Sequence, residues 1–215
     1  DPYWLEHKFL PLLGLNDRHL HQMPQHLHQF CGTGIDSWQY PCQFAHYLHH
    51  LAGQGITSYA EIGCHKGGTF IITVEYLGRF NAIQRALAVD NWERPIIHEY
   101  AKMNSVVEYL SESSQSKIFK DKLTSRKWDL ILIDGDHSYD AAKADYELCK
   151  EHARFLSFHD IVNFLTPGVP QVWREVTGEN PGSFPHTWTE QYDDVLLRMR
   201  GSIMGLGLIE VDSKT

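Results

Sequence analysis

Two apolar stretches of the sequence each end in carboxylate and imidazole side chains. LILIDGDHSYD ends its apolar run in Asp134, Asp136 and His137, and the later stretch RFLSFHD ends in His159 and Asp160. Such groups are costly beside apolar residues unless they bind something. We therefore expect Asp134 and Asp160 to hold a divalent cation beside a reactive hydroxyl, with His159 either a third ligand or a hydrogen-bonded core residue. The alternative for Asp160 is that it caps a turn.

A glycine-rich stretch, EIGCHKGG at residues 61–68, lies between an apolar run and an expected helix. Gly63 permits a tight turn, while Gly67 and Gly68 let the backbone approach a ligand and expose helix N-terminal amides. Asp90, at the end of the next apolar run, can accept hydrogen bonds from both hydroxyls of a ribose. Because neither GxGxxG nor GxxxxGK[ST] occurs, a single nucleoside with a small charged tail fits better than a dinucleotide. The alternative is that the glycines only build the turn and Asp90 caps a helix.

Short apolar runs alternate with amphipathic stretches from Ile56 onward, which is typical of parallel strands with helical crossovers. The expected strands are residues 56–63, 85–90, 105–112, 127–135, 154–160 and 205–211. The expected helices are residues 69–80, 94–103, 115–123, 138–152 and 169–178. Right-handed crossovers place the carboxyl ends of parallel strands on one edge of the sheet, where ligands bind. All the residues singled out above should therefore meet at that edge.

Residues 1–52 differ in composition from the rest, being polar, aromatic and rich in histidine. They are expected to form an N-terminal helical cap before a catalytic domain at 53–215. Eight of the 14 histidines fall in the first 50 residues. Asp36 can cap a helix over residues 37–52. On that helix His46 and His50 share one face, but two imidazoles are too few for a zinc site, so we interpret these histidines as solvated or hydrogen-bonded.

Composition narrows the class of protein. With 215 residues, 42% of them apolar, the chain is long enough for one domain with a substantial core. The net charge of −8 disfavours nucleic acid and anionic membranes as partners. Four widely spaced cysteines without a CxxC pair suggest reduced thiols in a cytoplasmic protein. The sequence contains no signal-peptide pattern and no apolar run long enough to span a membrane. Because the sequence does not begin with Met, it does not decide whether a segment precedes it. It also does not decide whether the protein forms a homo-oligomer.

The order of these motifs resembles the class I S-adenosylmethionine-dependent methyltransferases. The series EIGCHKGG, AVD, LILIDGDHSYD, FHDI, PGVPQVWREV and GLGLIEV is most similar to the metal-dependent branch that contains macrocin O-methyltransferase and the cephalosporin-hydroxylase-like proteins. The similarity covers about residues 56–212. It implies a Rossmann-like, doubly wound, mostly parallel seven-stranded α/β sheet. It also implies methyl transfer to a hydroxyl of a small molecule, such as a sugar or glycosylated metabolite, in natural product or glycan modification.

The expected contacts to S-adenosylmethionine have two sources. From the resemblance they are Glu61, Gly63, Gly67 and Asp90, and from position along the chain they are Gly68, Glu112, Ser113 and Asp134.

The resemblance implies Asp134 and Asp160 as metal ligands and His137 as the general base. The cation would stabilise a developing alkoxide while His137 accepts its proton. The family commonly has Glu where this chain has His159. Magnesium prefers oxygen ligands, so an imidazole ligand would favour manganese, iron or zinc; alternatively His159 points away and water completes the shell of magnesium or manganese.

The acceptor site is less well defined by the sequence. Trp38, Gln39 and Tyr40 could line it, since amphipathic aromatic residues suit sugar faces and polyphenols, although core packing is the alternative for Trp38. The loop at residues 166–173 could act as a lid. Two other functions stay open: a metal enzyme of the same fold that does not methylate, and a non-catalytic S-adenosylmethionine-binding subunit. Intact Asp134, His137 and Asp160 argue against the latter.

Overall fold

The computed structural model describes residues 1–179 and 185–211, and over these residues the chain folds around a seven-stranded sheet in the order β3-β2-β1-β4-β5-β7-β6. The strands are β1 (Ser58–Ile62), β2 (Arg85–Asp90), β3 (Val107–Ser111), β4 (Trp128–Ile133), β5 (Ala153–His159), β6 (His186–Trp188) and β7 (Leu206–Glu210). Strands β1 to β5 pair in parallel, and β7 runs antiparallel between β5 and β6. The mostly parallel, doubly wound sheet predicted from the sequence is confirmed.

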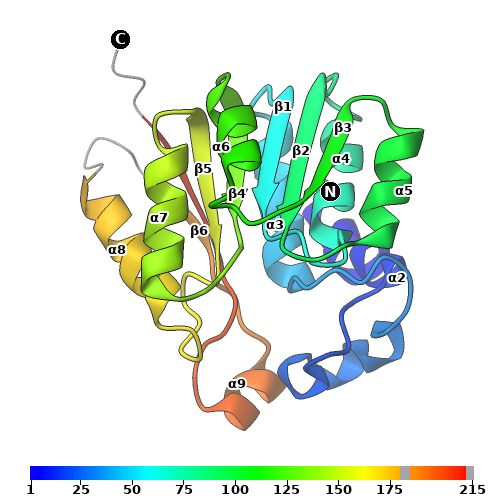
Figure 1. Cartoon of the computed structure of the whole chain (residues 1–215). Helices are drawn as coiled ribbons and strands as arrows, with labels where there is room; N and C mark the ends of the chain where they lie inside the picture. Colours follow the sequence, from blue (N-terminus) through cyan, green and yellow to red (C-terminus); the bar gives the residue numbers. More distant parts are fainter. Residues whose placement is uncertain (180–184, 212–215) are drawn as a thin grey trace.

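Helices cover both faces of the sheet (Figure 1). They are α3 (Pro41–Ala52), α4 (Gly68–Leu77), α5 (Pro95–Met103), α6 (Lys117–Thr124), α7 (Tyr139–Cys149) and α8 (Gly168–Glu179). Alternate residues of a strand point to opposite faces. Accordingly, Leu130 and Leu132 of β4 join the core beneath α3, α4 and α5. Ile131 and Ile133 join the core beneath α6, α7 and α8.

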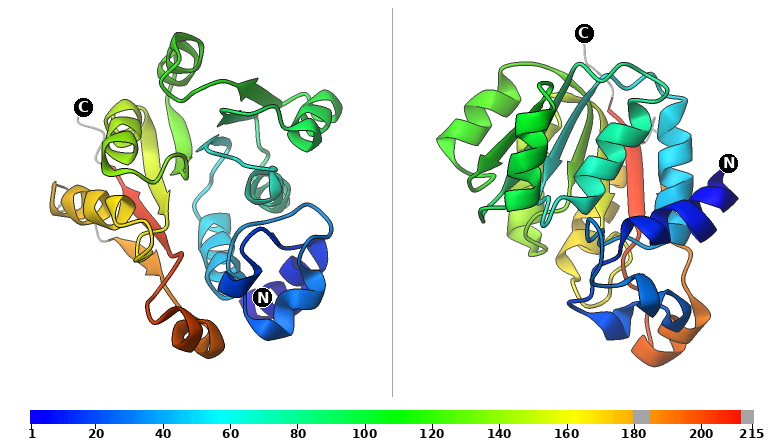
Figure 2. Two further views of the ribbon diagram at one scale, coloured as in Figure 1. Left: turned by 60° about the horizontal axis from the view of Figure 1, so that its bottom comes forward. Right: turned by 90° about the vertical axis from the view of Figure 1, so that its right-hand side faces the viewer.

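A third, smaller cluster joins the N-terminal segment to the region of α9, at the carboxyl edge of the strands (Figures 1 and 2). The N-terminal segment forms α1 (Pro2–Trp4), η1 (Leu5–Phe9), α2 (Leu10–Leu13), η2 (Leu20–Gln22) and η3 (Gln25–Phe30), and the C-terminal part forms α9 (Asp193–Met199). Leu5 and Leu10 pack into the core beneath α3, α4 and α5, whereas η3 and α9 contribute to the third cluster. Leu27 and Tyr40 pack there with Val195 and Ile203. The guanidinium of Arg198 donates to main-chain carbonyls of η2 and the residue after it, at 2.7 and 2.9 Å.

Two local expectations were wrong. The helix expected at residues 37–52 begins at Pro41, because proline fixes a helical φ and lacks an amide hydrogen, so it suits the first turn. Asp36 is therefore no helix cap: its φ is +60° and its side chain binds elsewhere. The loop expected at residues 166–173 is mostly the first part of α8, so it is no free lid.

No helix among the described residues has both the length and the apolar character needed to cross a membrane.

Candidate active site

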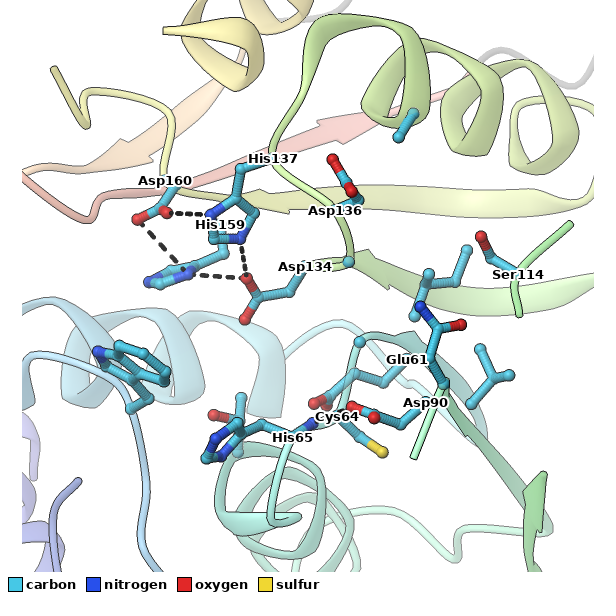
Figure 3. A pocket seen from close by; sticks show the side chains of 18 of the residues that line it. Glu61, Cys64, His65, Asp90, Ser114, Asp134, Asp136, His137, His159 and Asp160 are labelled. Atoms are coloured by element: carbon cyan, nitrogen blue, oxygen red, sulfur yellow. Dashed lines mark hydrogen bonds and ion pairs between the residues drawn. The ribbon is translucent and has the colours of Figure 1, made fainter. Parts of the chain in front are cut away.

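A cavity of about 590 Å³ opens at the carboxyl edge of the sheet. The segments that follow β1, β2, β3, β4 and β5 all contribute to its wall, as the crossover topology requires. Of the residues predicted from the sequence to act at the site, the lining includes Glu61, Gly63, Gly68, Asp90, Glu112, Ser113, Asp134, His137, His159 and Asp160. Figure 3 shows the side chains that meet there.

The glycines of the turn after β1 make room for protein as well as for a ligand. Gly63 has a φ of +85°, and a Cβ there would lie 2.0 Å from the carbonyl oxygen of Asp134. A Cβ at Gly68 would lie 2.6 Å from the backbone of Ser37, so this glycine lets the N-terminal segment rest on the start of α4. Gly67 is absent from the cavity lining, and its Cβ position is filled by the side chain of Ile97. Close packing between segments therefore explains Gly67 better than ligand contact.

Asp90 is held from several sides. The main-chain amide of His65 donates to Oδ2 at 2.8 Å, and the amide of Trp92 donates to Oδ1 at 3.0 Å. The guanidinium of Arg94 also binds Oδ1, with Nε at 3.0 Å and Nη2 at 2.9 Å from that oxygen. The helix cap expected as an alternative does not form, because the N-cap residue of α5 is Arg94. Oδ2 keeps a free lone pair that can accept from a hydroxyl of a ligand.

Glu61 is a buried carboxyl group in the wall of the cavity, only 1% exposed. The hydroxyl of Tyr59 donates to its Oε2, and Oε1 has no hydrogen-bond partner. Burial raises the pKa of Glu61 to about 8, although the bond from Tyr59 opposes the shift. The group is therefore largely neutral at pH 7 until a cation approaches it.

Two imidazoles and two carboxylates alternate at the ends of β4 and β5 (Figure 3). His137 lies between the carboxylates, with Nδ1 3.1 Å from Oδ2 of Asp160 and Nε2 3.4 Å from Oδ1 of Asp134. Nδ1 of His159 lies 3.0 Å from that same Asp134 oxygen and 3.7 Å from Oδ1 of Asp160. His159 is therefore neither turned away nor isolated in the core. It forms part of one acid–base cluster with the predicted residues.

The cluster compensates its own charge. Burial favours the neutral acid of Asp134, but His159 and His137 outweigh burial and lower its pKa to about 2. Burial would likewise lower the pKa of His159, but Asp134 and Asp160 raise it to about 9. The pKa of His137 is raised in the same way, against its burial, by Asp134 and Asp160. Carboxylate and imidazolium forms thus stabilise one another.

The cluster as it stands is not a preformed metal centre. In the described part of the chain, no group of three or more His, Cys, Asp or Glu side chains is arranged to hold a metal ion. The geometry explains this, because the ring of His137 occupies the space between the two carboxylates (Figure 3). Two observations nevertheless suit a divalent ion: Oδ1 of Asp160 is buried and lacks a hydrogen-bond partner, and Nδ1 of His159 faces both carboxylates.

Several lining residues were not predicted from the sequence. Arg94 and His65 lie in turns, and their contacts with Asp90 become evident only in the folded chain. Gln115 lies two residues after the predicted Glu112 and Ser113 and extends that part of the lining. The N-terminal segment adds His19 and Gln22. Trp38, expected from the sequence to line the acceptor site, does line the cavity. The same expectation was wrong for Gln39 and Tyr40, which are buried outside the lining, with the hydroxyl of Tyr40 donating to the carbonyl of Gln22 at 2.5 Å.

Comparison with known proteins bears on the class of the chain. Residues 60–161 match a family model described as a methyltransferase domain, and no curated protein matches the chain. The O-methyltransferase from Bacillus cereus in complex with SAH is 16% identical, with 83% of this chain and 84% of that chain covered and a TM-score of 0.58. TomG from Streptomyces achromogenes, an O-methyltransferase in complex with SAM, is 18% identical, with 94% and 93% covered and a TM-score of 0.57.

A third solved structure is CalS11, a TDP-rhamnose 3'-O-methyltransferase of calicheamicin biosynthesis. It is 12% identical, with 78% of this chain and 76% of that chain covered and a TM-score of 0.57. At these identities the likenesses show the fold, that of the class I methyltransferases. The match of residues 60–161 to a methyltransferase domain agrees with this fold.

Proposed function

We propose that the chain transfers a methyl group from S-adenosylmethionine to a hydroxyl of a small molecule, with a sugar or glycosylated metabolite as the leading acceptor class. The observation that carries the proposal is His137, whose imidazole lies in the cavity wall between Asp134 and Asp160. The likeness in fold to TomG and CalS11, both named as O-methyltransferases, supports O-methylation. Both of those enzymes take part in the synthesis of a natural product, which supports a small-molecule acceptor.

The chain's residues divide the chemistry between two halves of the cavity. The cofactor brings an already activated methyl group, so the protein has to position it and raise the nucleophilicity of the hydroxyl. Asp90, fixed by His65 and Arg94, would accept hydrogen bonds from the ribose. Glu61 would ionise opposite the cationic part of the cofactor, because a nearby positive charge offsets its burial.

At the other half, His137 would accept the hydroxyl proton as the methyl group leaves the sulfur. Asp134 and Asp160 orient the ring through both of its nitrogens and stabilise the imidazolium that forms. Because each nitrogen already faces a carboxylate, the acceptor has to displace one of these contacts or reach the ring while it is turned. The two carboxylates raise the pKa of His137, which makes the neutral imidazole a stronger base. The fraction of neutral imidazole increases as the pH rises.

A divalent metal is the second candidate for activating the hydroxyl. Asp134, Asp160 and His159 would hold it, and the observation that favours it is that Oδ1 of Asp160 is buried without a hydrogen-bond partner. When bound, such an ion would act as a Lewis acid on the acceptor oxygen. The mixed oxygen and nitrogen donors suit manganese, iron or zinc better than magnesium. Its binding would require His137 to leave the space between the carboxylates.

The test combines binding and turnover. Calorimetry should detect S-adenosylmethionine binding, and product assays with hydroxylated sugars and phenols should detect S-adenosylhomocysteine. Repeating both with manganese, with zinc and with a chelator separates the metal-assisted reaction from the His137 reaction. Absence of cofactor binding at millimolar concentration would contradict the proposal. Cofactor binding without methylation of any hydroxyl acceptor would instead favour an enzyme of the same fold that does not methylate.

We also propose a cytosolic location and a small-molecule partner in place of nucleic acid. Four free cysteines and the net charge of −8 support these two points.

A further inference from the structure

One part of the cavity is walled by the N-terminal segment together with segments near the C-terminus. It is formed by His19, Gln22 and Trp38 of the N-terminal segment and by Asn163, Leu165 and Met204 from the segments that flank α8 and β7. Thr166 also lines this part, and its hydroxyl lies 3.4 Å from Oδ2 of Asp160. This wall therefore begins where the acid–base cluster ends.

Trp38 presents an aromatic surface inside this wall. Its ring is partly exposed and is held on two sides, with ring centroids 5.4 Å from His19 and 5.3 Å from His65. Burial lowers the pKa of both imidazoles, with help from Arg18 for His19 and from Arg94 for His65, so both are mostly neutral at pH 7. Nδ1 of His65 is buried and has no hydrogen-bond partner. An uncharged ring with hydroxyl groups matches such a surface.

The charges around the cavity are one-sided. Among the described residues that line it, the acidic side chains are Asp36, Glu61, Asp90, Glu112, Asp134, Asp136 and Asp160, whereas Arg94 is the one lining residue with a permanent positive charge. Of the acidic side chains, Glu61 is largely neutral at pH 7 and Asp36 is paired with Lys66, which lies outside the lining. The guanidinium of Arg94 is already bound to Asp90 through two nitrogens. His137 and His159 balance Asp134 and Asp160. No lining cation is thus left over to pair with an anionic group of a substrate, and such a group would meet like charges.

We propose that the part of the cavity walled by His19, Gln22 and Trp38 is the acceptor subsite, that it takes an uncharged hydroxylated ring against Trp38, and that it rejects acceptors carrying phosphate or carboxylate. The inference rests on the proposed methyl transfer and narrows its substrate class. A sugar and a phenol share the required chemistry, and the experiment distinguishes them. A nucleoside diphosphate sugar, the acceptor type named for CalS11, is excluded by the same argument.

The test uses the full chain saturated with S-adenosylhomocysteine and two matched pairs of probes. One pair is methyl α-rhamnopyranoside and rhamnose 1-phosphate, and the other is catechol and 3,4-dihydroxybenzoate. Calorimetry should show the uncharged member binding at least tenfold more tightly in one pair or both. The pair with the larger difference identifies a sugar or a phenol as the acceptor type.

Three variants locate the binding. Trp38→Ala should weaken the uncharged probe at least tenfold without changing the affinity for S-adenosylhomocysteine, and Trp38→Phe should recover part of the loss. Gln22→Lys should improve binding of the anionic probe of the same pair. Trp4→Ala is the control, because Trp4 is 52% exposed and lies outside the cavity lining. It should leave both ligands unaffected.

Three results would overturn the subsite: tighter binding of the anionic probes, unchanged probe binding in Trp38→Ala, or binding of S-adenosylhomocysteine without binding of any probe. Failure of the wild-type chain to bind S-adenosylhomocysteine is a different result. It would overturn the proposed methyl transfer, on which the subsite depends.

Discussion

Asp36 of the N-terminal segment forms a salt bridge with Lys66 of the glycine-rich turn after β1. The amide of Asn16 also donates to Oδ1 of Asp36 at 2.5 Å, and Asp36 is only 8% exposed. Because the same turn donates the main-chain amide of His65 to Asp90, the N-terminal segment is connected to the cofactor half of the cavity through two successive residues.

The first prediction concerns this connection. Asp36→Asn should lower the free energy of unfolding by about 1 kcal/mol, a small value because Lys66 is half exposed to solvent. It should weaken S-adenosylmethionine binding as well, since the turn loses an anchor. Chemical denaturation and calorimetry measure the two effects. The control is Asp121→Asn, which removes an exposed pair with Lys117. Equal cofactor affinities in both variants would contradict the connection.

The second prediction concerns the base. His137→Ala should abolish methyl transfer while cofactor affinity changes less than about threefold, because His137 belongs to the acceptor half of the cavity and general-base catalysis contributes about 10²–10⁴-fold in rate. Steady-state kinetics and calorimetry measure the two quantities separately. His98→Ala, at an exposed position on α5, is the matched control. Full activity in His137→Ala would refute the role of the imidazole.

The third prediction concerns Asp134. Asp134→Asn should remove activity, because the amide neither stabilises an imidazolium nor holds a cation well. It should also lower stability, since His159 would keep a buried charge with one carboxylate fewer. Activity of the wild-type chain in chelator would favour the imidazole reaction, and its restoration by manganese or zinc would favour the metal reaction. A variant that remains active in chelator would remove Asp134 from both.

The fourth prediction is a pH dependence of stability. The pKa of Glu61 is raised from 4.5 to about 8 on folding, so the folded state binds more protons than the unfolded state between these values. Stability therefore falls as the pH rises through this window, and the raised pKa of His159 adds a loss in the same direction between 6.5 and about 9. The melting temperature without ligand should be higher at pH 5.5 than at pH 8.5.

Glu61→Gln should reduce that difference without abolishing it, because His159 still contributes. Glu151→Gln, at an exposed position, should leave the difference unchanged. Saturating S-adenosylmethionine should stabilise the wild-type chain more than the Gln variant at pH 8.5. An unaltered pH profile in Glu61→Gln would show that this carboxyl group is not neutral in the folded state.

The sequence predicted the residues that follow parallel strands, because the topology alone brings their ends together. Asp134 follows β4, and Asp160 follows β5, its immediate neighbour in the sheet. What the sequence could not predict are contacts set by turns. Arg94 reaches back to Asp90 from a loop, and Asp36 adopts a φ of +60° that redirects its side chain from a helix cap to Lys66.

The short elements near the C-terminus were also missed. Strand β6 has three residues, two of them exposed, so it carries no apolar alternation. Helix α9 exposes Leu196 and Leu197 and buries Val195 against the N-terminal segment, so its pattern makes sense only beside a partner far away in sequence. The wall that contains Trp38 depends on that long-range pairing, and local periodicity does not encode it.

The attachment of the N-terminal segment to α9 affects how the acceptor preference of the enzyme can change in evolution. Arg198 donates to the main-chain carbonyls of His21 and Met23, and Asp194 accepts from the main-chain amide of Gln25 at 2.8 Å. Backbone groups are present whatever side chains the segment carries. Substitutions at His19 or Gln22 can therefore accumulate while the segment stays anchored, so new acceptor preferences can arise without change to the residues that handle the methyl donor.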